Sequence, residues 1–144
     1  MKSRLFLDTN ILLDILLERP GYQSALGILQ AGCDGKYSLH TSVLSMANMA
    51  YVLRKTLSPG VLTPVLMQIA LLVDVLPMDA AQFRKAILLS GPDFEDILQI
   101  VCAVSGGCDT LVTKNPRHFS IQCGLLPGWT PPRILVPGDP GLSL

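Results

Sequence analysis

The carboxylate of Asp8 is the first side chain in the sequence that could do chemistry. It ends the apolar run Leu5-Phe6-Leu7 and precedes the polar pair Thr9-Asn10, after which apolar residues recur at helical spacing. A buried parallel strand delivers a side chain in this way to the carboxyl edge of a sheet, where open α/β folds bind ligands. A carboxylate beside an apolar core is costly unless hydrogen bonds or a cation offset its charge. Asp8 is therefore a candidate site residue, with simple capping of the following helix as the alternative.

Three acidic residues, Asp93, Glu95 and Asp96, lie at the start of another predicted helix. Gly91-Pro92 breaks the chain before them, and helically spaced apolar residues follow. Asp93 is suited to cap this helix, whereas Asp96 begins its apolar face and can point inward across the end of the sheet. Glu95 lies on a different face, and we expect it to be solvated. We predict Asp96 as a second site residue, with Asp93 assisting.

Amides and a hydroxyl complete the candidate site. Asn48 is a single polar residue inside an apolar helical pattern, so its amide either finds a hydrogen-bond partner in the core or belongs to a polar site. Thr113 and Asn115 follow a predicted buried strand and so fall on the same sheet edge as Asp8. We predict that Thr113 and Asn115 orient a metal-bound water.

The segment that follows Thr113 also carries positive charge. Lys114 and Arg117, with His118 beside them, predict a basic lip suited to phosphates, although a plain solvated loop would have the same composition. Carboxylates, amides and hydroxyls at one sheet edge form an oxygen-rich pocket, which suits Mg²⁺ or Mn²⁺ rather than zinc. Such ions serve phosphoryl chemistry by activating water and neutralising phosphate charge.

Composition narrows the class of protein. The 144 residues are 49% hydrophobic and 15% charged, which excludes disorder as the main state. Eleven Lys plus Arg balance eleven Asp plus Glu, so no global basic field attracts nucleic acid. No apolar run has the length of a membrane span, and Asp8 and Asp14 interrupt the start of the chain where a signal peptide would be apolar. The four cysteines form no CxxC pair, and we expect reduced, mostly packed thiols in a cytoplasmic protein.

The pattern of apolar residues predicts a single domain over residues 1–136 and a loose Pro- and Gly-rich tail over 137–144. Alternating strands and helices of this length indicate a parallel sheet with helices on both faces. Residues 115–119 are expected to form a loop with one helical turn. We predict strands at 3–7, 37–40, 73–76, 110–113 and 134–136, and helices at 9–17, 21–33, 61–72, 79–90 and 93–105. A further long helix is expected to run to about residue 56, with Thr41-Ser42, most simply Ser42, as its N-cap.

Taken together, these motifs resemble the PIN domain of the VapC-type toxin ribonucleases, over about residues 4–119. The resemblance lies in Leu7-Asp8-Thr9-Asn10, in Phe94-Glu95-Asp96-Ile97-Leu98-Gln99 and in the segment from Leu111 to Phe119. Asn48 stands where the family usually has a Glu, and Asn115 where it often has an Asp.

The resemblance implies a three-layer α/β/α domain with a central parallel sheet of four or five strands. It implies a Mg²⁺- or Mn²⁺-dependent endoribonuclease, the toxin of a toxin–antitoxin pair, with an RNA substrate, an antitoxin partner and a homodimeric state. Asp8 and Asp96, assisted by Asp93, would hold the ion. Asn48, Thr113 and Asn115 would position water and the scissile phosphate.

Two other functions fit the same residues. The amides at positions 48 and 115 are also consistent with a PIN-like RNA-binding or regulatory module that has lost catalysis, because fewer charges offset the dehydration of a cation. A phosphotransferase with Asp8 as nucleophile is the third hypothesis. Enzymes of the haloacid dehalogenase type need a second Asp two residues further on, and Asn10 stands there.

Overall fold

Five parallel strands form the central sheet in the computed structural model, which describes residues 2–125 and 128–143. The strand order is β3-β2-β1-β4-β5, and each neighbouring pair is parallel. This confirms the predicted parallel sheet, and of the four or five strands expected the sheet has five. The strands are β1 (Ser3–Leu7), β2 (Tyr37–Ser42), β3 (Asp74–Leu76), β4 (Thr110–Val112) and β5 (Arg133–Leu135).

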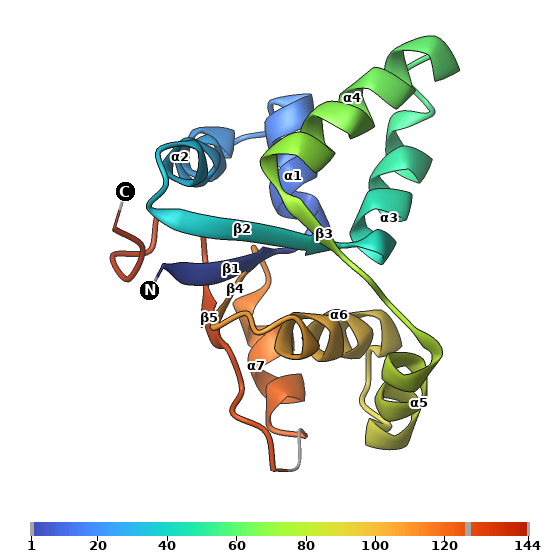
Figure 1. The fold of residues 1–144 in the computed structure, drawn as a ribbon, viewed down its shortest axis with the longest axis vertical. Coiled ribbons are helices and arrows are strands. Elements are labelled where there is room, and N and C mark those ends of the chain that lie inside the picture. The colour runs from blue at the N-terminus through green and yellow to red at the C-terminus, as the bar shows by residue number, and fades with distance from the viewer. Residues whose placement is uncertain (1, 126–127, 144) are drawn as a thin grey trace.

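Helices cover both faces of the sheet and complete the three predicted layers (Figure 1). One layer contains α1 (Thr9–Leu17), α2 (Tyr22–Cys33), α3 (Val43–Leu53) and α4 (Pro59–Leu72). The opposite layer contains α5 (Ala80–Leu89), α6 (Phe94–Ser105) and α7 (Pro116–Cys123). Among the described residues, no helix is both long and apolar enough to cross a membrane.

The central strand β1 separates two apolar cores. Leu5 and Leu7 belong to the core beneath α1–α4, whereas Phe6 packs into the core beneath α6 and α7. Successive side chains of a strand point to opposite faces, so a strand covered on both sides must be apolar throughout. This burial explains why the sequence before Asp8 is a continuous apolar run.

Polar side chains begin three of the helices as the sequence predicts. Asp8 accepts a hydrogen bond from the Thr9 amide, and Ser42 Oγ accepts one from the amide of Ser45 at 2.9 Å. Asp93 Oδ1 accepts one from the Asp96 amide at 3.1 Å. Each cap satisfies a backbone donor that has no partner within its own helix.

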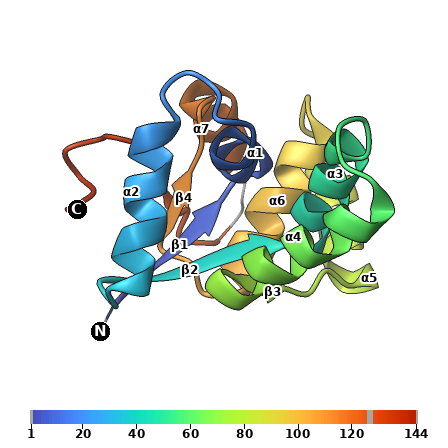
Figure 2. The same ribbon diagram turned by 90° about the horizontal axis from the view of Figure 1, so that it is seen from above.

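Two segments differ from the expectation. Residues 116–123 form α7, a helix of two turns rather than one, which begins with Pro116 at its first position. The expectation of a loose tail is wrong for the described part, which ends at Ser143. Leu142 is 6% exposed and belongs to the core beneath α2, and the Tyr37 hydroxyl donates to the Ser143 carbonyl at 3.1 Å. A single apolar anchor therefore holds a segment of loop-like composition beside α2 (Figure 2).

Candidate functional site

A pocket of about 300 Å³ opens at the carboxyl edge of the sheet. Its wall includes Asp8, Asn48, Asp96 and Asn115, so that four of the residues predicted from the sequence lie together. They come from the end of β1, from α3, from the first turn of α6 and from the residue before α7. The topology brings them together because β1 lies at the centre of the sheet and its carboxyl end faces the helices on either side.

Asp8 is the most buried acid of this pocket, with 9% of its surface exposed. Its Oδ1 accepts a hydrogen bond from the Thr9 amide at 2.8 Å, and its Oδ2 accepts one from Thr113 Oγ1 at 3.0 Å. Burial raises the pKa of Asp8 above its usual range, and the negative charges of Glu95 and Asp93 raise it further, against the lowering effect of the two hydrogen bonds. A cation beside Asp8 would relieve this electrostatic cost.

Thr113 lies behind Asp8, fully buried. Its hydroxyl donates to Asp8 and accepts a hydrogen bond from the Asn115 amide at 3.1 Å. It therefore fixes the orientation of the Asp8 carboxylate and the turn that leads into α7. In the segment between β4 and α7, Asn115 is the residue that lines the pocket.

Asp96 is half-buried and faces Asp8 across the pocket. Burial and the neighbouring charges of Asp93 and Asp8 raise the pKa of Asp96 to about 6, although a hydrogen bond from Gln122 opposes the shift. The Nε2 of Gln122 donates to Asp96 Oδ2 at 3.2 Å and to the His118 carbonyl at 3.1 Å. Gln122 thus ties the orientation of Asp96 to α7.

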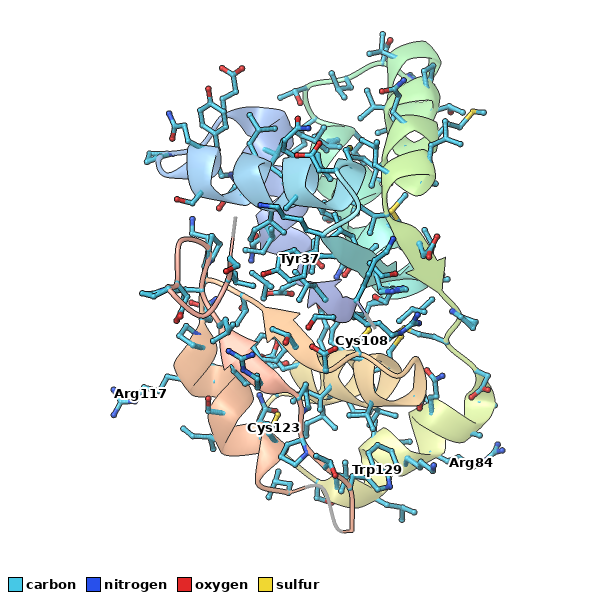
Figure 3. The ribbon with its side chains drawn as sticks, turned by 60° about the vertical axis from the view of Figure 1, so that its left-hand side comes forward. Tyr37, Arg84, Cys108, Arg117, Cys123 and Trp129 are labelled. Atoms are coloured by element: carbon cyan, nitrogen blue, oxygen red, sulfur yellow. The ribbon has the colours of Figure 1, made fainter. Side chains whose placement is uncertain are left out.

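Besides Thr113, three predicted residues lie outside the wall of this pocket. Asp93 caps α6 and lines a neighbouring depression with His118 and Gln122. The Nζ of Lys114 lies 2.8 Å from Oδ2 of the buried Asp14, in a separate pocket beside α2. Arg117 is exposed, and Figure 3 shows its side chain pointing away from the body of the protein.

Glu95 is exposed, as expected, but it also lines the pocket. The Nδ2 of Asn48 donates to Glu95 Oε1 at 2.7 Å. The sequence predicts a solvated Glu95 because the pattern of α6 alone places this residue on a polar face. In the structure α3 lies across the pocket from that face of α6, so Glu95 becomes part of the site.

A buried polar network below the pocket was not predicted from the sequence. Gln99 accepts from Ser42 Oγ at 2.6 Å and donates to Ser45 Oγ at 2.7 Å, and Thr9 Oγ1 donates to Ser45 Oγ at 2.9 Å. The available signal was the spacing of Gln99, which follows Asp96 by three residues and so lies on the same helical face. Gln122 was missed because α7 is longer than predicted.

The donor chemistry of the pocket suits a hard divalent cation. Carboxylate and amide oxygens line it, and no cysteine or histidine does so, which is the ligand set that Mg²⁺ and Mn²⁺ prefer. Within residues 2–125 and 128–143, no three acidic, histidine or cysteine side chains are grouped closely enough to form a metal site by themselves. Asp8 and Asp96 would therefore hold a cation together with amide oxygens and water.

The strand order, the flanking helices and the acidic pocket define the class of protein as an α/β domain with a polar site at the carboxyl edge of its sheet. The PIN domain model matches residues 4–117. The chain therefore belongs to the PIN domain family, and the resemblance noted in its motifs is confirmed.

Known proteins of similar sequence and structure agree with this assignment. The chain is 27% identical to "Ribonuclease VapC1" of Aquifex aeolicus (strain VF5) over 124 residues, which cover 82% of this chain and 85% of the relative. The structure of VapBC2 from Rickettsia felis, bound to a DNA fragment from their promoter, contains a chain with a TM-score of 0.67 and 17% identity, covering 93% of this chain and 98% of that one. A toxin–antitoxin complex from Klebsiella pneumoniae gives a TM-score of 0.63 with 18% identity, covering 99% and 97%. These two structures share the fold.

Proposed function

We propose that this protein is a divalent-cation-dependent endoribonuclease and the toxin of a toxin–antitoxin pair. The observation that carries the proposal is the convergence of Asp8, Asp96, Asn48 and Asn115 in one pocket at the carboxyl edge of a PIN domain sheet. The curated relative named a ribonuclease supports the same activity, since it aligns with most of the chain.

In this proposal Asp8 and Asp96 hold Mg²⁺ or Mn²⁺, and Asp93 assists through its nearby charge. The cation would supply an activated water and neutralise charge on the scissile phosphate. Thr113 holds the Asp8 carboxylate in place through its 3.0 Å hydrogen bond, and Gln122 does the same for Asp96. The amides of Asn48 and Asn115 line the pocket, where they can bind the phosphate or the attacking water.

Arg117 is the basic residue best placed to bind RNA beyond the pocket, because its exposed side chain lies in the first turn of α7, two residues after Asn115. A phosphate contact by Lys114 would require its ammonium group to leave the buried carboxylate of Asp14. We therefore propose that Arg117 contributes more to RNA binding than Lys114 does.

Cleavage of single-stranded RNA by the purified protein should require Mg²⁺ or Mn²⁺ and should stop in EDTA. Asp96→Ala should abolish it, because the substitution removes one of the two carboxylates that hold the ion. Gel analysis of a broad RNA pool measures both effects. Activity that survives EDTA but not Asp96→Ala would indicate a metal-free mechanism. Absence of cleavage together with absence of Mn²⁺ binding would favour the RNA-binding or regulatory module, for which the amides at positions 48 and 115 are the supporting observation.

We further propose a homodimer in the cytoplasm and an antitoxin that covers the pocket. Large apolar side chains are exposed on α4 and α5, among them Met67, Leu71 and Leu88. Met67 and Leu71 lie four residues apart and so share one face of α4, and contiguous apolar surface commonly marks protein interfaces. The toxin–antitoxin complex of similar fold supports the antitoxin partner. Light scattering at micromolar concentration should give the mass of a dimer. Leu71→Glu should weaken association if α4 forms the interface. A monomer mass for the wild-type protein would contradict the proposal.

A further inference from the structure

We propose that Glu95 is the third carboxylate of the cation site, that it acts through cation-bound water, and that Asn48 holds it in place. This inference rests on the proposed cation-dependent function. It assigns a third negative charge of the pocket to α6, opposite Asn48 of α3.

The contact between the two side chains spans the pocket. Asn48 and Glu95 both line it, and the Asn48 amide donates to Glu95 Oε1 at 2.7 Å. Their helices belong to opposite layers, since α3 lies on one side of the sheet and α6 on the other (Figure 1). The hydrogen bond therefore orients an otherwise exposed carboxylate toward the site. A carboxylate has about four acceptor positions, so one amide contact leaves it able to bind water as well.

The charge of Glu95 already acts on the proposed cation ligand. Among the charged groups that raise the pKa of Asp8, Glu95 has a larger effect than Asp93. Carboxylates that repel one another in one pocket are stabilised by a cation between them. Glu95 thus contributes to the electrostatic field that would attract the ion.

In the arrangement observed, water would mediate the contact between Glu95 and the ion. Asp8, Asp96 and Glu95 are not grouped closely enough to bind one ion directly. Mg²⁺ is commonly held by one or two carboxylates and keeps several of its waters. A further carboxylate that accepts hydrogen bonds from those waters adds negative charge and orients them. Groups in such outer positions affect metal affinity by about 10- to 100-fold.

Calorimetric titration with Mn²⁺ tests the role of Glu95. Glu95→Gln keeps the size of the side chain and removes its charge, and we expect the affinity for Mn²⁺ to fall by about 10-fold or more. Glu18→Gln is the matched control, because Glu18 is the only other glutamate in the sequence and does not line the pocket. It should leave the affinity unchanged. Asp93→Asn keeps a capping side chain and removes another nearby charge. Because Asp93 lines the neighbouring depression and Glu95 lines the pocket itself, the effect of Asp93→Asn should be smaller than that of Glu95→Gln.

An isosteric exchange tests the contact with Asn48. In the double variant Asn48→Asp with Glu95→Gln, amide and carboxylate change places across the same hydrogen bond. The affinity for Mn²⁺ should return to within about 3-fold of wild type, which is a difference of about 0.65 kcal/mol or less in binding free energy. Asn48→Asp alone puts two carboxylates in contact. Its melting temperature should therefore fall in EDTA and recover with Mn²⁺ by linkage.

The outcomes separate the two proposals. Loss of affinity in Glu95→Gln that the exchange restores supports the role of Glu95. Three results would overturn the role of Glu95 and leave the cation site of Asp8 and Asp96 in place. They are wild-type Mn²⁺ affinity in Glu95→Gln, a loss of affinity in Asp93→Asn as large as that in Glu95→Gln, and failure of the exchange to restore binding. Absence of Mn²⁺ binding by the wild-type protein would overturn both.

Discussion

Replacing Asp8 by asparagine should abolish Mn²⁺ binding and lower RNA cleavage by about 10³-fold. The size follows from the several kcal/mol by which a bound metal stabilises charge in the transition state, since each 1.36 kcal/mol is about 10-fold in rate. The same substitution should raise the melting temperature in EDTA. Asp8 is 9% exposed and its charged form is disfavoured by burial and by the acids nearby.

The substitution keeps contacts to both hydrogen-bond partners of Asp8. Asn Oδ1 can still accept from the Thr9 amide, and the Thr113 hydroxyl can accept from the new NH₂ group. The buried Thr113 hydroxyl then loses the acceptor for its own proton, which offsets part of the stabilisation. The stabilisation should depend on pH. The pKa of Asp8 is raised in the folded state, so its ionisation costs nothing below the usual value of 3.8 and costs more as the pH rises through the folded-state pKa. The difference in melting temperature between variant and wild type should therefore grow from about pH 4 and level off above the folded-state pKa of Asp8.

Asp14→Asn is the matched control for this effect. Asp14 lies on α1, which Asp8 caps, and is also buried, but Lys114 and Arg19 pair with it at 2.8 and 3.5 Å. Its replacement should lower the melting temperature, because the cationic partners lose their counter-charge. Calorimetry with and without Mn²⁺ measures both variants. Unchanged Mn²⁺ affinity in Asp8→Asn would remove Asp8 from the site.

Features set by nearby residues could be predicted from the sequence, and features set by packing between distant segments could not. The position of Asp8 after a buried strand and the caps at Ser42 and Asp93 depend on a few neighbouring residues, and they lie as expected. The convergence of Asp8 with Asp96 followed from a general rule about parallel sheets.

The differences arise where a distant partner determines the direction of a side chain. Lys114 lies at the predicted edge of the sheet, but its ammonium group pairs with the buried carboxylate of Asp14 in a separate pocket beside α2. Glu95 was assigned to a solvated face because nothing in the local sequence shows that α3 crosses nearby. The docked tail depends on one apolar residue, Leu142, in a segment whose Pro and Gly content otherwise indicates a loop.

The buried network around Gln99 gives the prediction with the largest expected effect on stability. Gln99 is 1% exposed and makes hydrogen bonds of 2.6 and 2.7 Å with Ser42 and Ser45. Gln99→Leu keeps a similar volume but leaves these hydroxyls with fewer partners, and each buried polar group without a partner costs about 1–3 kcal/mol. We expect a loss of about 2–4 kcal/mol, or roughly 10 °C in melting temperature.

The same variant should also weaken the site, because the network connects the helices that carry it. Ser45 lies three residues before Asn48 on α3, and Gln99 lies three residues after Asp96 on α6, so their contact fixes the distance between these two helices. Mn²⁺ affinity should therefore fall even below the melting transition. Gln68→Leu, at an exposed position of α4, should change stability by less than about 0.5 kcal/mol.

A double variant separates lost hydrogen bonds from lost packing. Ser42→Ala combined with Gln99→Leu removes one donor together with its acceptor, so it should be less unstable than the sum of the single variants. Chemical denaturation of the four proteins gives the coupling energy. Additive losses would show that the hydrogen bond between Ser42 and Gln99 does not contribute to stability. Unchanged Mn²⁺ affinity in Gln99→Leu would show that the spacing of α3 and α6 does not depend on this network.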